Sequence, residues 1–244
     1  MAEPRRGWRG PRATFALVLA GFAILIALGT WQMERRVWKT DLIATMTARL
    51  AAPPIPVTEL LANHSAEDYR PVSASGTFRH DQEMYLAARS YQGQLGYHVI
   101  TPLVLDDGQT VVLVDRGWVP VDRQSPDSRA AGQIPGPVTV SGIARRPPKP
   151  GLFTPDNRPD QNLWYWADLP AMAAHVGLSQ VAPLLIEAGT GENPGGLPIG
   201  GQTFINLPNN HLQYAITWYS LAVVLVVIYL VSRRRTAADS STRS

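Results

Sequence analysis

Two long uncharged apolar stretches, one near each end of the chain, most constrain how this protein folds. The first runs from Ala13 to Trp31 over 19 residues, and the second runs from Leu212 to Val231 over 20 residues. A helix of about 20 apolar residues is long enough to cross the hydrocarbon core of a bilayer. We therefore expect two transmembrane helices and a membrane protein.

Arginine clusters beside both stretches predict the orientation. Four arginines precede the first stretch, and Arg233, Arg234 and Arg235 follow the second. Because basic flanks stay in the cytoplasm, we expect both ends of the chain there and the long middle segment on the far side of the membrane. The predicted organisation is a basic tail (1–12), a transmembrane helix (13–31), an extracytoplasmic domain (32–210), a second transmembrane helix (211–231) and a basic tail (232–244).

A bacterial inner-membrane protein with a periplasmic domain is the simplest interpretation of this pattern. The alternative is a cleaved signal peptide, because Ala27-Leu28-Gly29 resembles a cleavage site. The first stretch is longer than a usual signal core, however, and the large side chain of Trp31 follows it at once. The residues before it also lack the Ser-rich, amphipathic character of a mitochondrial presequence.

The charge distribution argues against a nucleic-acid partner. The whole chain carries a net charge of +3, but each predicted tail carries +3 by itself, so the remaining 219 residues carry −3. A phosphate backbone requires a basic surface, which this mildly acidic body does not supply. The chain also has no cysteine, which excludes a disulfide scaffold, a zinc ribbon, an iron–sulfur protein and a thiol oxidoreductase.

The segment between the apolar stretches is predicted to be rich in β-strands. Pro53-Pro54-Ile55-Pro56 marks a linker, and Asp106-Asp107-Gly108-Gln109 is a hairpin signal because glycine accepts a positive φ. A short helix fits 168–176, with Asp168 as its cap and Gly177 after its end. The fold expected is α+β, an antiparallel barrel or sandwich. Its strand-like runs are 70–78, 83–89, 97–105, 110–115, 137–144, 163–167 and 181–187.

Local signatures of catalysis and of metal binding are missing from the sequence. None of the five histidines lies within four residues of another, so no H-x-H or H-E-x-x-H zinc site forms locally. The chain also lacks a G-x-S-x-G nucleophile elbow, a P-loop and a G-x-G-x-x-G turn. We therefore expect a protein that is not an enzyme. A periplasmic hydrolase whose site assembles only in three dimensions remains the alternative.

Small residues in both apolar stretches indicate that the two helices pack together. Ala16, Ala20, Ala23 and Ala27 form a stripe at helical spacing in the first stretch, and Ala215 and Ala222 share a face of the second. Small side chains let membrane helices approach closely. The alternative is that alanine is simply common in this chain.

His211 is the residue whose position suggests a function. It begins the second apolar stretch, and Ala215, Trp218 and Ala222 lie within about 40° of its direction on a helix. An imidazole above a shallow face of small residues would suit a flat macrocycle with an iron to ligate. The alternative is an ordinary interfacial histidine in an aromatic belt, to which Tyr214 also belongs. The predicted topology places Trp31 and Gln32 at the same membrane interface.

Several short motifs, in order over about residues 29–230, resemble the surfeit-locus-one family of cytochrome c oxidase assembly factors. They are Gly29-Thr30-Trp31-Gln32, Tyr69-Arg70-Pro71-Val72, Gly96-Tyr97-His98-Val99, Val114-Asp115-Arg116-Gly117-Trp118, Asn162 to Trp166 and Pro208-Asn209-Asn210-His211-Leu212-Gln213-Tyr214. Asp115 stands where many relatives would have Asn. The resemblance implies a protein with two transmembrane helices that helps to mature haem–copper oxidases.

For bacterial members, the resemblance implies binding of haem a and its insertion into oxidase subunit I. The family's histidine corresponds to His211, which becomes the expected axial ligand of the haem iron. The expected partners are subunit I, other oxidase assembly proteins and the lipid bilayer. The residues expected around the haem are Trp31, Gln32, Asn210, Tyr214 and Trp218.

Two alternatives accompany this interpretation. Arg116 would pair with a haem propionate, or it would form a structural salt bridge at the end of a strand. The protein as a whole would carry haem a, or it would be a haem-free membrane scaffold that stabilises an oxidase assembly intermediate.

Overall fold

The computed structural model describes residues 11–63, 68–203 and 208–241. The chain divides into two compact units, one formed by Met1–Thr45 with Asn206–Ser244 and the other by Met46–Ile205. We call them the helix unit and the β-unit. Most of the predicted N-terminal tail, including Arg5, Arg6 and Arg9, lies outside the described residues, as do His64 and Arg243.

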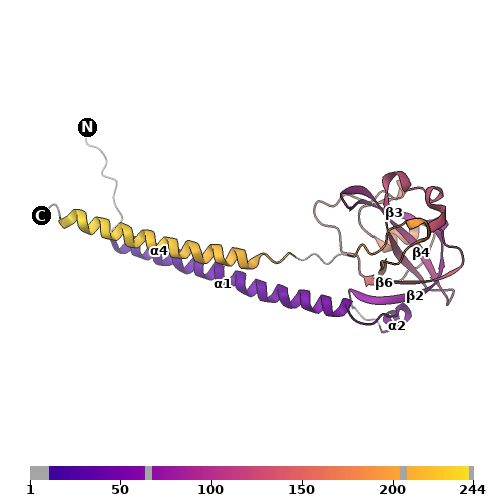
Figure 1. Ribbon diagram of the computed structural model, residues 1–244, viewed down its shortest axis with the longest axis horizontal. Helices are drawn as coiled ribbons and strands as arrows, with labels where there is room; N and C mark the ends of the chain where they lie inside the picture. The colour runs from indigo at the N-terminus through magenta and orange to yellow at the C-terminus, as the bar shows by residue number, and fades with distance from the viewer. Residues whose placement is uncertain (1–10, 64–67, 204–207, 242–244) are drawn as a thin grey trace. The chain divides into compact units, whose positions relative to one another are not determined.

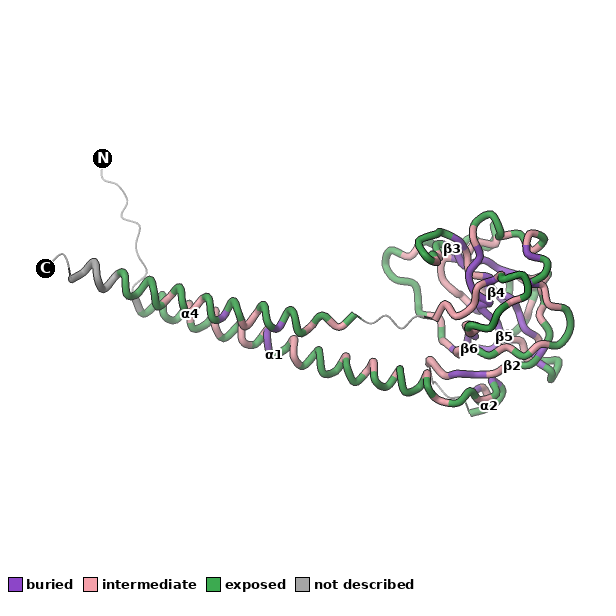
Figure 2. The backbone as a smooth tube through the Cα atoms, in the orientation of Figure 1, coloured by how far each residue is buried: buried purple, intermediate pink, exposed green. Residues whose placement is uncertain are grey.

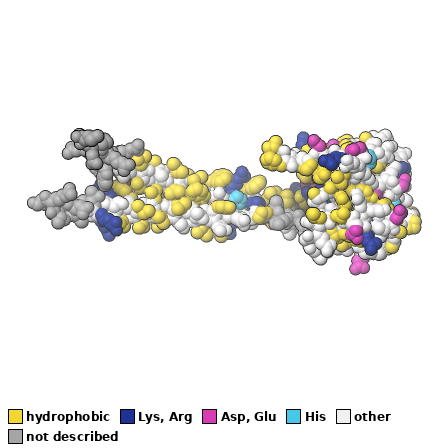
Figure 3. Space-filling model, turned by 90° about the horizontal axis from the view of Figure 1, so that it is seen from above, with side chains coloured by type: hydrophobic (Ala, Val, Ile, Leu, Met, Phe, Trp, Pro, Cys, Tyr) yellow, Lys and Arg dark blue, Asp and Glu magenta, His cyan; other side chains and the backbone are white. Residues whose placement is uncertain are grey.

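The helix unit contains helix α4 (His211–Ser241) and most of helix α1 (Pro11–Leu50), whose last turn belongs to the β-unit. Both are long and apolar enough to cross a membrane by length and composition, and Figure 3 shows hydrophobic side chains along most of their visible surface. Helix α1 continues well beyond Trp31, because residues 33–50 contain neither glycine nor proline. It ends shortly before Pro53-Pro54, where proline removes backbone donors and blocks further helix.

Helices α1 and α4 lie side by side and run in opposite directions (Figure 1). Ala215 and Ala222 are each only 1% exposed, so the prediction that they pack against the other helix is confirmed. The alanine stripe predicted for α1 is wrong, because Ala16, Ala20, Ala23 and Ala27 are all exposed.

A glycine face of α1 makes the contact with α4 instead. Gly29 is buried, and a Cβ added there would lie 2.5 Å from the ring of Tyr219. A Cβ added at Gly21 would lie 3.3 Å from the Leu225 side chain. Ala27 is two residues from Gly29, or about 200° around the helix, so its side of α1 points away from α4.

The β-unit is built from short strands and two short helices, and most of its buried residues lie on the strands (Figure 2). The strands are β1 (Ile55–Pro56), β2 (Arg70–Phe78), β3 (Met84–Tyr91), β4 (Gln94–Leu105), β5 (Val111–Pro120), β6 (Pro137–Arg145), β7 (Leu163–Trp164) and β8 (Leu185–Ala188). The helices are α2 (Val57–Ala62) and α3 (Leu169–His175), and five 3-10 turns connect the elements. All seven predicted strand runs contain a strand, and the predicted linker at Pro53–Pro56 ends in β1.

The strands form one sheet in the order β1-β2-β6-β8-β5-β4-β3-β7, and an added pairing of β2 with β4 closes it into a small barrel. Strands β2, β6, β8, β5 and β4 form the ring. The prediction of a β-rich barrel is confirmed, but the prediction of an antiparallel sheet is wrong in part. Strand β8 pairs parallel with β5, because the chain between β6 and β8 returns through α3 on the outside of the barrel.

Two hydrophobic clusters cover the two faces of the barrel wall. Alternate residues of β5 point inward, with Val112 and Val114 in the barrel interior beside Ile186 of β8. Leu113 points outward into a second cluster, which includes Trp164 and Met172 of the segment that carries α3. This alternation follows from the period of two in a strand, and it leaves an outer face on which a site can form.

Local turn and capping chemistry agrees with the sequence. The Asp168 side chain accepts a hydrogen bond from the Ala171 N–H at 3.2 Å and caps α3, as predicted. Gly108 in the predicted hairpin has a φ of +68°. Asp107 accepts hydrogen bonds there from the N–H groups of Gln109 and Thr110. These contacts position β4 and β5 for pairing.

Candidate functional site

The side chain of His211, at the start of α4, meets Gln32 of α1. His211 Nδ1 lies 2.7 Å from Gln32 Oε1. An amide oxygen accepts hydrogen bonds and does not donate them, so Nδ1 carries the hydrogen and Nε2 of the neutral ring keeps its lone pair. Among the described residues, Nε2 has no hydrogen-bond partner. In the neutral ring, this contact leaves Nε2 as the nitrogen that can ligate a metal.

Further polar contacts on either side of this pair join the two helices. The Asn209 side-chain amide donates to Thr40 Oγ1 at 3.2 Å, and the hydroxyls of Thr30 and Tyr219 lie 3.3 Å apart. In an apolar medium such hydrogen bonds between helices stabilise one packing geometry. They fix the register that brings His211 opposite Gln32.

The structure brings together some of the predicted site residues and leaves others at the surface. Trp218 is half-buried and lies on the same face of α4 as His211. Ala215 lies on this face too and is buried against α1. Trp31 is 48% exposed and Tyr214 is 56% exposed. Asn210 is exposed, and its backbone carbonyl accepts the first hydrogen bonds of α4.

Trp31 belongs to an aromatic and cationic cluster on α1. The Arg35 guanidinium carbon lies 5.8 Å from the ring centre of Trp31 and 5.2 Å from that of Trp38. Arginine on tryptophan is a common arrangement where a helix meets a polar interface, because the ring is apolar and the cation prefers water.

Arg116 lies in the β-unit, where its side chain is 2% exposed. Its guanidinium donates to Glu83 Oε1 at 3.2 Å and to the Gly132 carbonyl, and it stacks 4.9 Å from the ring centre of Phe78. Burial lowers the pKa of Arg116 to about 10, although the charge of Glu83 opposes this shift. This geometry favours the internal ion pair over the expected contact with a haem propionate.

Glu83 is the centre of this buried network. It also accepts hydrogen bonds from Arg129 at 3.3 Å and from Gln133 at 3.1 Å. Burial alone would raise the pKa of the carboxyl group, but His80, Arg129 and Gln133 together lower it to about 2. The network is therefore ionised at neutral pH and holds the β3–β5 region together.

In the part of the chain that the structure describes, no group of three or more His, Cys, Asp or Glu side chains could hold a metal ion. One imidazole serves as a ligand where the metal brings its other ligands with it, as iron does in haem. The free Nε2 of His211 and the neighbouring ring of Trp218 fit such a group.

Comparison with known proteins decides the family. The sequence model of the SURF1 family matches residues 19–223. The chain belongs to the SURF1 family. The match begins in α1 and ends in α4, so it spans the β-unit and reaches into both helices. The resemblance to the surfeit-locus-one family is thereby confirmed.

Individual SURF1 relatives match most of the chain. It is 40% identical over 233 residues to a SURF1-like protein of Monosiga brevicollis. The alignment covers 91% of this chain and 88% of that protein. It is 40% identical to Surfeit locus protein 1 of Xenopus tropicalis, with 83% of this chain and 70% of that one covered. It is 38% identical to Surfeit locus protein 1 of Homo sapiens, and the alignment covers 80% of this chain and 69% of that protein.

Sequence reasoning missed the contacts that define the helix pair. Local sequence patterns do not predict the packing role of Gly29 or the bridge between Thr40 and Asn209. Gly29 carries only a general signal, because glycine within an apolar helix often marks close helix approach. Thr40 and Asn209 carry no such signal in the sequence. They lie 169 positions apart, and their contact depends on how the two helices align.

Proposed function

We propose that this SURF1 family member is a membrane-bound, non-enzymatic assembly factor for haem–copper cytochrome c oxidase. In this proposal it holds haem a through His211 and passes it to oxidase subunit I. The observation that carries the proposal is the hydrogen bond from His211 Nδ1 to Gln32, which leaves Nε2 available as an axial ligand.

The proposed setting is a bacterial inner membrane crossed by α1 and α4. Both termini would be cytoplasmic and the β-unit periplasmic, with His211 near the outer interface. The support for this orientation is the three arginines that follow the second apolar stretch. Arg35 stacked on Trp31 fits an interface at that end of the first stretch.

A carrier must release its cargo, which suits a site with one protein ligand. When bound, haem supplies an iron that accepts the Nε2 lone pair. Gln32 orients the ring, since a hydrogen bond to the other imidazole nitrogen fixes both the tautomer and the direction of a ligating histidine. Trp218 is the half-buried apolar side chain beside it, whereas Ala215 and Ala222 are buried against α1.

The test is the haem absorption of protein purified from cells that make haem a. We expect a Soret band in the wild type that is lost or strongly shifted in His211→Ala. Gln32→Leu should retain haem with weaker binding, by about 10- to 100-fold, because second-shell partners of metal ligands have effects of that size. His175→Ala, at an exposed histidine of α3, is the matched control and should keep the wild-type spectrum. An unchanged spectrum in His211→Ala would remove His211 from the ligand role.

A haem-free scaffold is the second candidate function. Leu152 and Phe153 are adjacent and each 93% exposed in the β-unit, as expected for a contact with a partner protein. This alternative predicts that the protein purifies with subunit I and without stoichiometric haem. Replacing both residues by serine should then reduce recovery of subunit I.

A further inference from the structure

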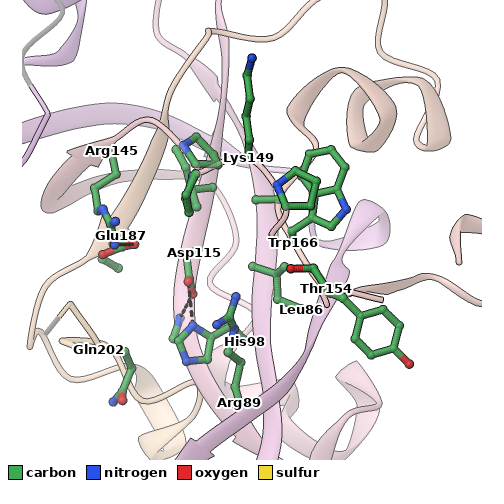
Figure 4. A pocket seen from close by; sticks show the side chains of 18 residues that line it. Leu86, Arg89, His98, Asp115, Arg145, Lys149, Thr154, Trp166, Glu187 and Gln202 are labelled. Carbon is green, nitrogen blue, oxygen red and sulfur yellow. Dashed lines mark hydrogen bonds and ion pairs between the residues drawn. The ribbon is translucent and has the colours of Figure 1, made fainter. Parts of the chain in front are cut away.

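A cavity lies within the β-unit, on the outer face of the barrel wall. It has a volume of about 480 Å³, within the range of about 300–1,000 Å³ typical of small-molecule sites. Its floor comes from β3, β4, β5 and β8, and the proline-rich segment 147–150 and residues 165–167 form its rim. Figure 4 shows the side chains of Arg89, His98, Asp115 and Trp166 around this space.

A β-bulge in β3 brings Arg89 to the cavity. Leu86 pairs with His98 and Arg89 pairs with Gly96, so three steps along β3 match two steps along β4. The extra residue is accommodated at Ala88, whose φ is +55°. In a regular strand, residues three apart face opposite sides. The bulge instead places Leu86 and Arg89 on the same face, and both line the cavity.

The acidic side chains of the cavity are already neutralised or hydrogen-bonded. Asp115 accepts a hydrogen bond from His98 Nδ1 at 2.8 Å and another from the Gly117 N–H at 3.0 Å. Glu187 pairs with Arg145 at 2.9 Å and accepts a hydrogen bond from the Thr203 hydroxyl. Both carboxylates therefore already have hydrogen-bond partners within the chain.

Besides the exposed Lys149, Arg89 is the lining cation without an ion pair among the described residues. Among the described residues its guanidinium has no ion pair or hydrogen-bond partner. Its Nε atom is nevertheless buried. A buried donor on a charged group without an acceptor is costly, which makes Arg89 a side chain suited to receive an anion from outside the chain. Figure 4 shows the Arg89 and His98 side chains reaching the same part of the cavity.

The rest of the lining is mainly apolar. Leu86 and Leu185 cover the floor, and Trp166 with the neighbouring prolines forms the rim. Asn157 accepts a hydrogen bond from the Trp166 N–H at 3.3 Å and donates to the Trp166 carbonyl at 3.1 Å, which fixes the tryptophan backbone. A ligand that matches this lining has one anionic group and an apolar body.

We propose that this cavity binds a small organic anion, a carboxylate with an apolar body, through Arg89. The guanidinium fork donates two parallel hydrogen bonds to a carboxylate, and Leu86, Leu185 and Trp166 contact the apolar part. The site lies entirely within the β-unit and is independent of His211.

The test uses the full chain in phosphatidylcholine nanodiscs and 2-naphthoate as the probe, with calorimetric titration and empty nanodiscs as the blank. We expect one saturable site in the wild type. Arg89→Gln should weaken binding about tenfold or more, because hydrogen bonds to charged groups contribute about 1.5–3 kcal/mol. Arg89→Lys should weaken it less, since it keeps the charge and loses the fork.

Two controls make the result specific. Arg79→Gln, at an exposed arginine outside the cavity, should bind 2-naphthoate like the wild type. The neutral analogue 2-naphthalenemethanol should bind much more weakly than 2-naphthoate. Arg89→Gln should melt at the wild-type temperature, because no described group depends on its guanidinium. Absence of saturable binding, equal binding of the alcohol, or unchanged binding in Arg89→Gln would each overturn the proposal.

Discussion

At the scale of single residues, Glu83 shows how strongly one buried charge can depend on its partners. Its side chain is 2% exposed and pairs with both Arg116 and Arg129. Removing one member of a buried ion network leaves the others uncompensated, at a cost of about 3–5 kcal/mol. We expect Glu83→Gln to lower the free energy of unfolding of the β-unit by that amount at pH 7, measured by urea denaturation. Glu192→Gln, at an exposed glutamate, should change it by less than about 0.5 kcal/mol.

The lowered pKa of Glu83 predicts that the stability of the β-unit falls at acidic pH. The pKa of Glu83 is lowered from 4.5 to about 2 on folding, so its contribution is fully present above pH 4.5 and is lost as the pH falls towards 2. The linked free energy is on the order of 3 kcal/mol. The stability difference between the wild type and Glu83→Gln should therefore shrink across this window. A difference that stays constant from pH 6 to pH 2.5 would contradict the lowered pKa.

At the scale of elements, the pairing of α1 with α4 depends on glycine at position 29. A side chain there would meet the ring of Tyr219, so Gly29→Leu should separate the helices. The chain has no cysteine of its own, so cysteines introduced as Thr40→Cys and Asn209→Cys report on the pairing without background. We expect a short thiol crosslinker to join them efficiently in this background and several-fold less after Gly29→Leu.

The matched control for this experiment is Ala27→Leu, on the exposed face of α1. It adds the same side chain to the same helix and should leave crosslinking unchanged. If Ala27→Leu were the more disruptive of the two, the alanine stripe and not the glycine face would form the interface.

Sequence patterns predicted elements well and their partners poorly. The run 70–78 and the helix capped by Asp168 were predictable, because alternation and capping are local properties. The parallel pairing of β8 with β5 and the bulge at Ala88 were not. Strand register depends on contacts between distant segments, and a bulge changes which side chains share a face.

At the scale of the whole molecule, the proposed topology makes a prediction about accessibility. If both termini are cytoplasmic, a cysteine introduced as Ser179→Cys in the β-unit should react with a membrane-impermeant maleimide in intact cells whose outer membrane is permeable to it. A cysteine introduced as Ser244→Cys should react only after the inner membrane is opened. The reverse pattern, or labelling of both in intact cells, would contradict the orientation.

The sequence alone determined the two apolar helices and the β-rich character of the segment between them, because hydropathy and alternation are local properties of the chain. It also singled out His211 as the candidate ligand, which stays a prediction. Tertiary structure decided what those residues contact. It set His211 opposite Gln32, enclosed Arg116 with Glu83, closed the barrel through β2 and β4, and gathered Arg89 and His98 around one cavity. These contacts join positions far apart in the chain, and their geometry depends on how helices and strands pack, which local sequence does not specify.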